Sequence, residues 1–251
     1  MVREELHHEG WTRRALLASV APTQFRREEG KGRWFESDRK KVVDAATDFT
    51  LVRLTDPGYA SRLPSSGLRY VARSEAFLLY SCGRGGSLQV FRLELATGRQ
   101  QQLTEAQSLD PSTPALTPDD GSICYFDGPS LRRVWLKNLR EKQLYRVPEG
   151  WRRTEGFSLA RDGSYAAFVE VQGDTQRLRL VRISSGKAAT LVESAQPLAD
   201  PLLHSRRQGV LHRQGPDPLY LARLDGRATR RLPLPPGLLG HFVWAPEGRS
   251  I

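Results

Sequence analysis

The stretch Thr117-Pro118-Asp119-Asp120-Gly121-Ser122-Ile123-Cys124-Tyr125-Phe126 decides the fold. Its Asp-Gly pair suits a tight turn, and the apolar run that follows suits a strand buried on both faces. Two further stretches with the same pattern begin at Ala160 and Ala245. A turn motif that recurs along a chain is typical of a repeat protein, in which each copy forms one small structural unit.

A second kind of segment accompanies these turns, with apolar and polar residues in alternation. It occurs at 88–95, 131–139, 178–183 and 219–224. This period of two, with β-branched and aromatic residues present, predicts strands. Gly98, Gly186 and Gly226 follow three of these segments and can supply the positive φ of a tight hairpin.

The repeat length identifies the architecture. The last strand of each unit ends near Leu103, Val147, Leu191 and Leu232, roughly 41 to 44 residues apart. This is the spacing of a four-stranded propeller blade. We therefore predict an all-β fold, a β-propeller over residues 33–251 with about five blades, an incomplete version of a larger ring. Full blades are expected near 66–105, 109–149, 151–193 and 196–234, with partial blades at 41–55 and 238–251.

Residues 1–32 precede the predicted propeller and form a tail or an export signal. Arg13 and Arg14 are followed by a short apolar core that ends at Ala21, an arrangement similar to a twin-arginine signal. A short amphipathic helix or a tail is the other interpretation. We expect a cytoplasmic protein, with the periplasm as the alternative.

Composition limits the classes of partner. The net charge is +10, which favours anionic partners, although a merely solubilising surface is the other interpretation. The arginines are spread along the chain rather than focused in one patch, so we expect no nucleic-acid partner. No apolar run approaches the ~20 residues of a membrane span. Cys82 and Cys124 fit no metal or disulfide pattern and are expected to be buried free thiols.

The turn pattern resembles the repeats of TolB, and three longer stretches resemble the oligogalacturonate lyases, which are seven-bladed propellers. The stretch from Asp44-Ala45-Ala46-Thr47 to Val52-Arg53-Leu54-Thr55 is like the family's "DAATG…VVRLT". Residues 144–151, LYRVPEGW, are like "YQVPEEW". Residues 241–248, HFVWAPEG, are like "HEFWxPDG".

The resemblance implies β-elimination of pectin-derived oligogalacturonides, acidic sugars that suit a basic protein. In that reaction a base removes the proton α to the uronate carboxylate, and a divalent metal (manganese) and basic residues neutralise the charge. His241 matches the histidine of "HEFW", and His212 matches that of "CHEGP", so both are candidate catalytic residues. The family's metal ligands lie in later blades, so the resemblance assigns no metal ligand here.

Each histidine also has a purely structural interpretation, as a hydrogen-bonded residue at a blade edge. The alternative function is a non-catalytic, TolB-like propeller that binds a protein or glycan. The sequence does not set the oligomeric state. An open propeller would expose apolar blade faces, which predicts poor solubility unless the chain dimerises.

Overall fold

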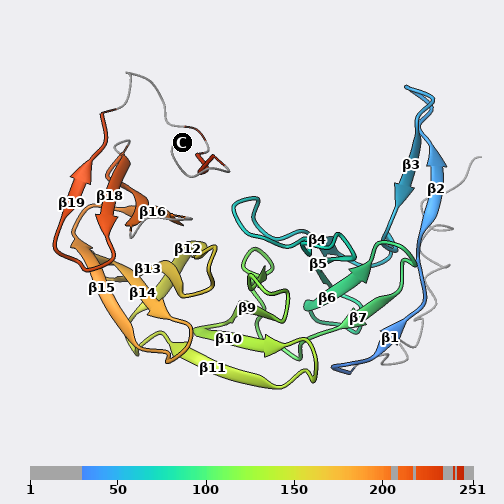
Figure 1. Cartoon of the computed structure of the whole chain (residues 1–251), viewed down its shortest axis with the longest axis horizontal. Coiled ribbons are helices and arrows are strands. Elements are labelled where there is room, and N and C mark those ends of the chain that lie inside the picture. The colour runs from blue at the N-terminus through green and yellow to red at the C-terminus, as the bar shows by residue number, and fades with distance from the viewer. Residues whose placement is uncertain (1–29, 205–208, 217–218, 234–239, 241, 246–251) are drawn as a thin grey trace, which may run out of the picture.

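The computed structural model describes residues 30–204, 209–216, 219–233, 240 and 242–245. Within these residues every regular element is a strand. Four antiparallel sheets, the blades, stand side by side in an open arc (Figure 1). The predicted all-β propeller is therefore confirmed. The predicted export signal, His241 and residues 246–251 lie outside the described residues.

Blades 1 and 2 occupy the first half of the described chain. Blade 1 comprises β4 (Ser61–Arg62), β5 (Phe77–Cys82), β6 (Gln89–Glu94) and β7 (Gln100–Gln102), and β1 (Trp34–Phe35) adds to β7 as a fifth strand. Blade 2 comprises β8 (Ala115–Leu116), β9 (Ser122–Asp127), β10 (Ser130–Trp135) and β11 (Glu141–Arg146).

Blades 3 and 4 repeat the same meander. Blade 3 comprises β12 (Arg152–Leu159), β13 (Tyr165–Gln172), β14 (Thr175–Arg182) and β15 (Ala188–Ser194). Blade 4 comprises β16 (Leu198–Leu203), β17 (Gly209–Gln214), β18 (Leu219–Arg223) and β19 (Thr229–Arg231). A separate two-stranded hairpin consists of β2 (Lys40–Val43) and β3 (Thr50–Arg53).

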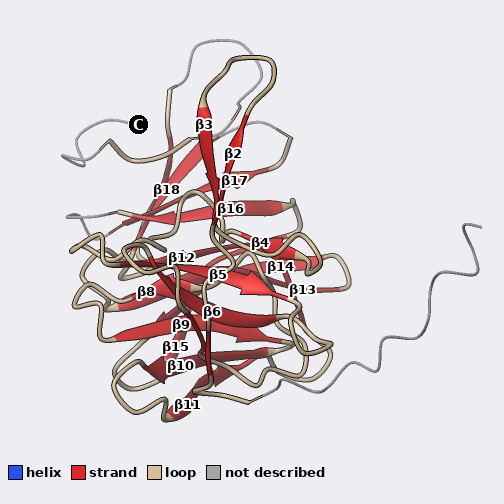
Figure 2. Cartoon of the chain, turned by 90° about the vertical axis from the view of Figure 1, so that its right-hand side faces the viewer, coloured by secondary structure: helices blue, strands red, loops and turns tan. Residues whose placement is uncertain are grey.

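The chain runs outward through each blade. The first strands, such as β4, β12 and β16, lie toward the hollow of the arc, and the last strands, such as β11, β15 and β19, follow its outer edge (Figure 1). Seen from the side, the β2–β3 hairpin stands beyond the blades (Figure 2). Any ligand that enters the hollow therefore meets the first strands. No described helix is long and apolar enough to cross a membrane.

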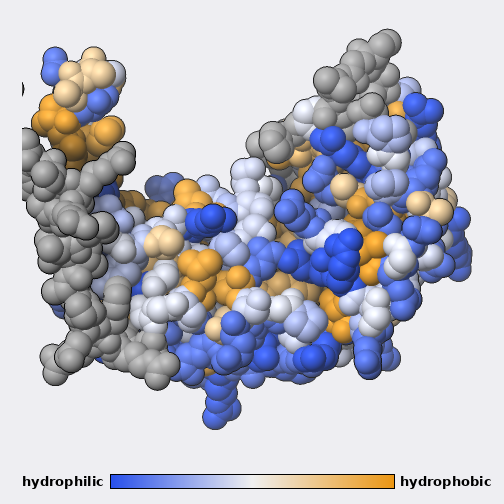
Figure 3. Space-filling model, turned by 180° about the vertical axis from the view of Figure 1, so that it is seen from behind, coloured by the Kyte–Doolittle hydropathy of each residue, from blue (hydrophilic) through white to orange (hydrophobic). Residues whose placement is uncertain are grey.

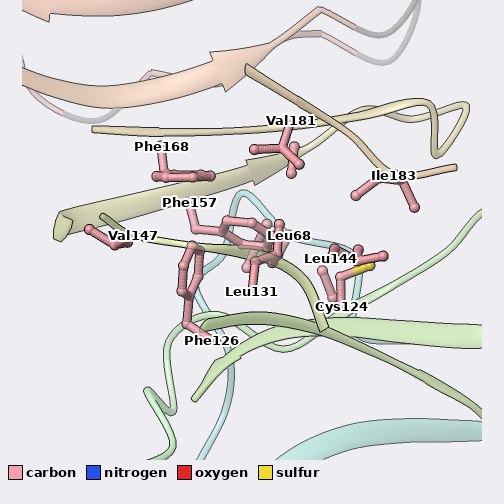
Figure 4. Close-up of a cluster of buried hydrophobic side chains, with 12 residues drawn as sticks. Leu68, Cys124, Phe126, Leu131, Leu144, Val147, Phe157, Phe168, Val181 and Ile183 are labelled. Atoms are coloured by element: carbon pink, nitrogen blue, oxygen red, sulfur yellow. The ribbon is translucent and has the colours of Figure 1, made fainter. Parts of the chain in front are cut away.

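Apolar side chains fill the interfaces between blades. Between blades 2 and 3, the Phe126 ring packs edge-on against Phe168, with ring centroids 5.0 Å apart, and against Phe157 at 5.6 Å. Leu68 joins this cluster from the segment between β4 and β5, so blade 1 also contributes to it (Figure 4). Edge-to-face aromatic pairs add stabilisation beyond the area that they bury.

A buried carboxylate also ties blades 2 and 3 together. Glu170 on β13 has no exposed surface. The Tyr145 hydroxyl of blade 2 donates a hydrogen bond to it over 2.7 Å, and the Arg177 guanidinium lies 2.6 Å away. Arg177 in turn stacks on Trp151, 3.6 Å from the ring centroid. A buried charge is tolerated only with such partners.

One predicted strand is too long. The alternation at 131–139 predicts a strand to Leu139, but β10 ends at Trp135. Leu139 adopts a φ of 55° and donates its amide to the Trp135 carbonyl over 2.8 Å, which closes a turn. The side chain of Leu139 packs against the core between blades 1 and 2. This burial offsets the strain of a left-handed residue.

Cys82 and Cys124 are free and buried, as predicted. Burial raises the pKa of the Cys124 thiol to about 12, with Arg133 opposing the shift weakly. That thiol is therefore protonated at neutral pH and is a structural residue.

Candidate functional site

The first strands of blades 3 and 4 are bent where they face the hollow. The register of β12 shifts between Arg153 and Phe157, and that of β16 shifts between Ala199 and Leu202. Gly156 has a φ of 95°, and Asp200, although not a glycine, has a φ of 49°. Bulges re-aim side chains and are frequent next to binding sites. The space-filling view shows the hollow that these strands border (Figure 3).

An ion pair joins blades 2 and 3 at this position. The Arg153 guanidinium at the start of β12 bonds the Asp110 carboxylate from the segment before β8. It also lies over the Phe126 ring, 4.4 Å from the centroid. Burial raises the pKa of Asp110, but hydrogen bonds from Ser112 and the charge of Arg153 outweigh burial, and the net shift is downward. Asp110 is therefore ionised at neutral pH.

A second ion pair lies within blade 4. The Arg213 Nε on β17 is 2.9 Å from an Asp200 carboxylate oxygen on the bulge of β16. The Arg213 guanidinium lies 5.7 Å from the Phe242 ring centroid and donates to the Gly240 carbonyl. The side chain of Asp200 is 57% exposed and that of Arg213 is 23% exposed. This pair is more accessible to an anionic ligand than Asp110 and Arg153.

An aromatic contact accompanies the second pair. The His204 ring, just after β16, meets Trp244 edge-on at 4.2 Å between centroids. The Trp244 indole also donates to the Leu202 carbonyl over 3.5 Å. The segment containing Trp244 therefore packs along the first strand of blade 4.

His212 lies away from these groups, in the interface between blades 3 and 4. It lies on β17 two residues after Val210, which packs against blade 3, so both side chains point to the same face. The ring has no exposed surface and stacks on Tyr220 at 5.8 Å. Within the described residues neither ring nitrogen makes a well-formed hydrogen bond. The catalytic role of His212 stays a prediction, as does that of His241.

The position of His212 recurs in every blade. Tyr80, Tyr125, Glu170 and His212 each stand three residues before the glycine that follows the second strand. Tyr80 bonds Gln100, and Tyr125 donates to Glu141 over 2.8 Å. Glu170 is held by arginine, so three of the four have a strong polar partner. Among the described residues His212 has no comparably strong polar partner, which distinguishes blade 4.

Burial sets the protonation state of His212. Loss of solvent lowers its pKa, and the Val210 backbone and the Gln214 side chain only partly offset that effect. The imidazole is therefore neutral at pH 7, which is the form that can accept a proton.

Sequence reasoning missed the two ion pairs at the hollow. Asp110-Pro111 and Asp200-Pro201 are a repeated dipeptide that could have drawn attention to both acids. The arginine partner of Asp110 is 43 residues away in the chain, so only the fold brings them together.

The described residues contain no group of three or more metal-ligating side chains. The two acids at the hollow, Asp110 and Asp200, are each bonded to an arginine. Because a cationic partner occupies each carboxylate, this donor set does not fit a divalent metal.

These features define the class of the protein: a β-propeller of four-stranded antiparallel blades with arginine–aspartate pairs on the first strands of blades 3 and 4. No family model matches the chain. The oligogalacturonate lyase of Dickeya dadantii is 24% identical over 250 residues, covering 88% of this chain and 64% of that protein. The oligogalacturonide lyase of Pectobacterium atrosepticum is 24% identical over 237 residues, covering 83% and 61%. The chain thus spans less than two thirds of the length of these relatives.

Solved structures agree on the fold. An oligogalacturonate lyase in complex with manganese superposes with a TM-score of 0.77 at 23% identity, covering 81% of this chain and 61% of that one. An oligogalacturonate lyase from Vibrio parahaemolyticus gives a TM-score of 0.76 at 21% identity, covering 80% and 61%. TolB from Acinetobacter baumannii gives 0.54 at 18%, covering 82% and 56%. The resemblance to lyase and TolB propellers is therefore confirmed for the fold.

Proposed function

We propose that this chain is an oligogalacturonate lyase-like protein whose substrates are oligogalacturonides cleaved by β-elimination. The observation that carries the proposal is the 24% identity to two named lyases, one match extending along 88% of the chain. The net charge of +10 suits an acidic sugar.

The chemistry requires a cation near the uronate carboxylate. Negative charge grows on that group as the α-proton leaves, and a guanidinium stabilises it by paired hydrogen bonds. Arg213 is the described residue that we assign to this role, since it pairs with Asp200, an exposed carboxylate on the first strand of blade 4. The uronate would then share or replace the Asp200 contact.

The base is assigned to a histidine. His241 and His212 are the candidates that the resemblance supplies, and His212 is neutral and able to accept a proton. Its ring must leave the interface with blade 3 to meet a substrate, because it has no exposed surface in this conformation. No metal is assigned to the described residues.

The test is ultraviolet absorbance of the unsaturated uronate product, with digalacturonate and added manganese. Binding is measured separately by calorimetry, with a neutral galactose disaccharide as the control ligand. The Arg213→Gln variant should bind digalacturonate about tenfold more weakly, since a charged hydrogen bond is lost. Arg223→Gln is the matched control. Arg223 ends β18, one strand farther from the hollow than β17, and also pairs with an aspartate, Asp225, at 2.8 Å.

A non-catalytic propeller that binds a protein or glycan is the second candidate. The lack of a metal-ligating group among the described residues favours it, as does the TolB-like fold. Binding of digalacturonate without any absorbance change would support this candidate. If digalacturonate neither binds nor yields an unsaturated product, the oligogalacturonide proposal is rejected altogether.

A further inference from the structure

The hairpin of β2 and β3 differs from every other sheet in the described residues. It has two strands where the others have four or five. In the described chain neither of its edges pairs with another strand. An isolated two-stranded hairpin is marginally stable in water, and its open edges are templates for further pairing.

The side chains of this hairpin are apolar and exposed. Val43 is 63% exposed, Leu51 is 54% exposed, and Phe49 at the turn is 70% exposed. Val42 and Val52 are also exposed. The hairpin stands clear of the blades, so a large partner can reach it (Figures 1 and 2). Such a set of exposed apolar groups on one element marks an interaction surface.

The hydrogen-bond pattern shows which backbone groups are available. The Asp44 amide donates to the Phe49 carbonyl over 2.9 Å, and Val42 lies opposite Leu51. In an antiparallel ladder the bonded pairs alternate with unbonded ones. Lys41 and Val43 are therefore in unbonded pairs, and their amides and carbonyls point away from β3, along the free edge of β2.

We propose that two copies of this chain pair through the free edges of β2, antiparallel, to form one four-stranded sheet. Lys41 of one copy then lies opposite Val43 of the other, and the two residues exchange backbone hydrogen bonds. Val42 lies opposite Val42 of the second copy on the twofold axis. A twofold contact of this kind is the commonest way in which identical chains associate.

Charge complementarity favours a second copy as the occupant. In this register Lys40 of each copy lies opposite Asp44 of the other, so an opposite-charge pair flanks the valines at both ends. Asp44 is half-buried, and one of its carboxylate oxygens accepts a hydrogen bond from the Thr47 hydroxyl at 2.5 Å, so the other oxygen is the one that can face Lys40. Self-pairing of β3 centred on Leu51 would place Arg53 opposite Phe49 and gives no such pair.

The decisive experiment compares two variants, each of which removes one outward-pointing backbone N–H, from opposite edges of the hairpin. Lys41 and Val52 are cross-strand partners in an unbonded pair, so both amides point outward, from opposite edges. Lys41→Pro should weaken dimerisation about tenfold or more, because proline cannot donate the inter-copy bond. Val52→Pro is the matched control and should leave the dimer unchanged. Molar mass is measured by sedimentation velocity over a range of concentrations.

Lys40→Glu tests the charge pair separately, since it places two acids opposite each other. It should weaken the dimer, and high salt should reduce the difference from the unmodified chain. A monomer at all concentrations would overturn the proposal. A monomer in which the Lys41 amide exchanges slowly with solvent would show that another strand of the same chain covers this edge. Equal losses in Lys41→Pro and Val52→Pro, or none in either, would also overturn it.

Discussion

The buried ring of His212 couples the stability of the protein to pH. Its pKa lies below the ordinary value of about 6.5 in the folded state, because burial disfavours the charged form. In the unfolded chain the ring titrates near that ordinary value. Below a pH of about 6.5, the unfolded chain binds a proton at this ring and the folded chain does not. The contribution of a neutral His212 to stability is therefore fully present above about pH 6.5 and is lost as the pH falls.

We expect the free energy of unfolding to drop by up to about 1.4 kcal/mol per pH unit below pH 6.5 because of this residue. His212→Phe keeps a ring against Tyr220 and removes the titrating group. Urea unfolding at a series of pH values, with both proteins, measures the difference. An unchanged pH dependence in His212→Phe would show that other groups cause the acid sensitivity.

Sequence could place His212 on a strand but could not say which face it occupies. Its position three residues before Gly215 matches the spacing in the other blades, yet alternation alone does not distinguish an interface from the hollow. Asp200 was missed for a different reason. Its exposure and its positive φ arise from a bulge, which shifts the register and has no reliable signature in one sequence.

At the scale of the element, the hairpin turns separate what sequence can predict from what it cannot. Glycine predicts a positive φ at Gly98, Gly186 and Gly226, and their φ values are 75°, 74° and 70°. Blade 2 uses Leu139 at the corresponding place, so its turn was mistaken for strand. A leucine carries no local signal for a left-handed conformation, and the packing of its partly buried side chain against the core between blades explains it.

Two glycines of blade 3 give a matched pair of substitutions. Gly173 has a φ of 54° and nothing within 4 Å of an added Cβ, whereas at Gly186 the Cβ would lie 2.2 Å from the Leu144 carbonyl oxygen. Gly173→Ala should cost about 1–2 kcal/mol through left-handed strain alone. Gly186→Ala should cost about 1–3 kcal/mol more, since the turn must move away from blade 2. Chemical denaturation measures both, and equal losses would contradict the proposed contact.

At the scale of the whole molecule, the arc is a stack in which each blade packs on its neighbours. In such a stack the stability is approximately a sum over blades and the interfaces between neighbouring blades, so one interface can open without the others. The segment between β4 and β5 departs from this scheme. The Ser65 amide bonds the Ser112 carbonyl at 3.0 Å, and Leu68 enters the core between blades 2 and 3. Blade order could be predicted from the repeat, but this crossing could not, because the segment lacks the repeat pattern.

Leu68 therefore acts as a brace between blade 1 and blades 2 and 3, and its removal should destabilise more than one interface. Leu68→Ala should cost about 2–5 kcal/mol, the range for a buried leucine, since it is only 6% exposed. Leu63→Ala, in the same segment but 56% exposed, is the control and should cost little. Hydrogen exchange distinguishes the brace from an ordinary core residue. Protection should fall in blade 1 as well as in blades 2 and 3, whereas loss confined to blades 2 and 3 would leave Leu68 as core packing alone.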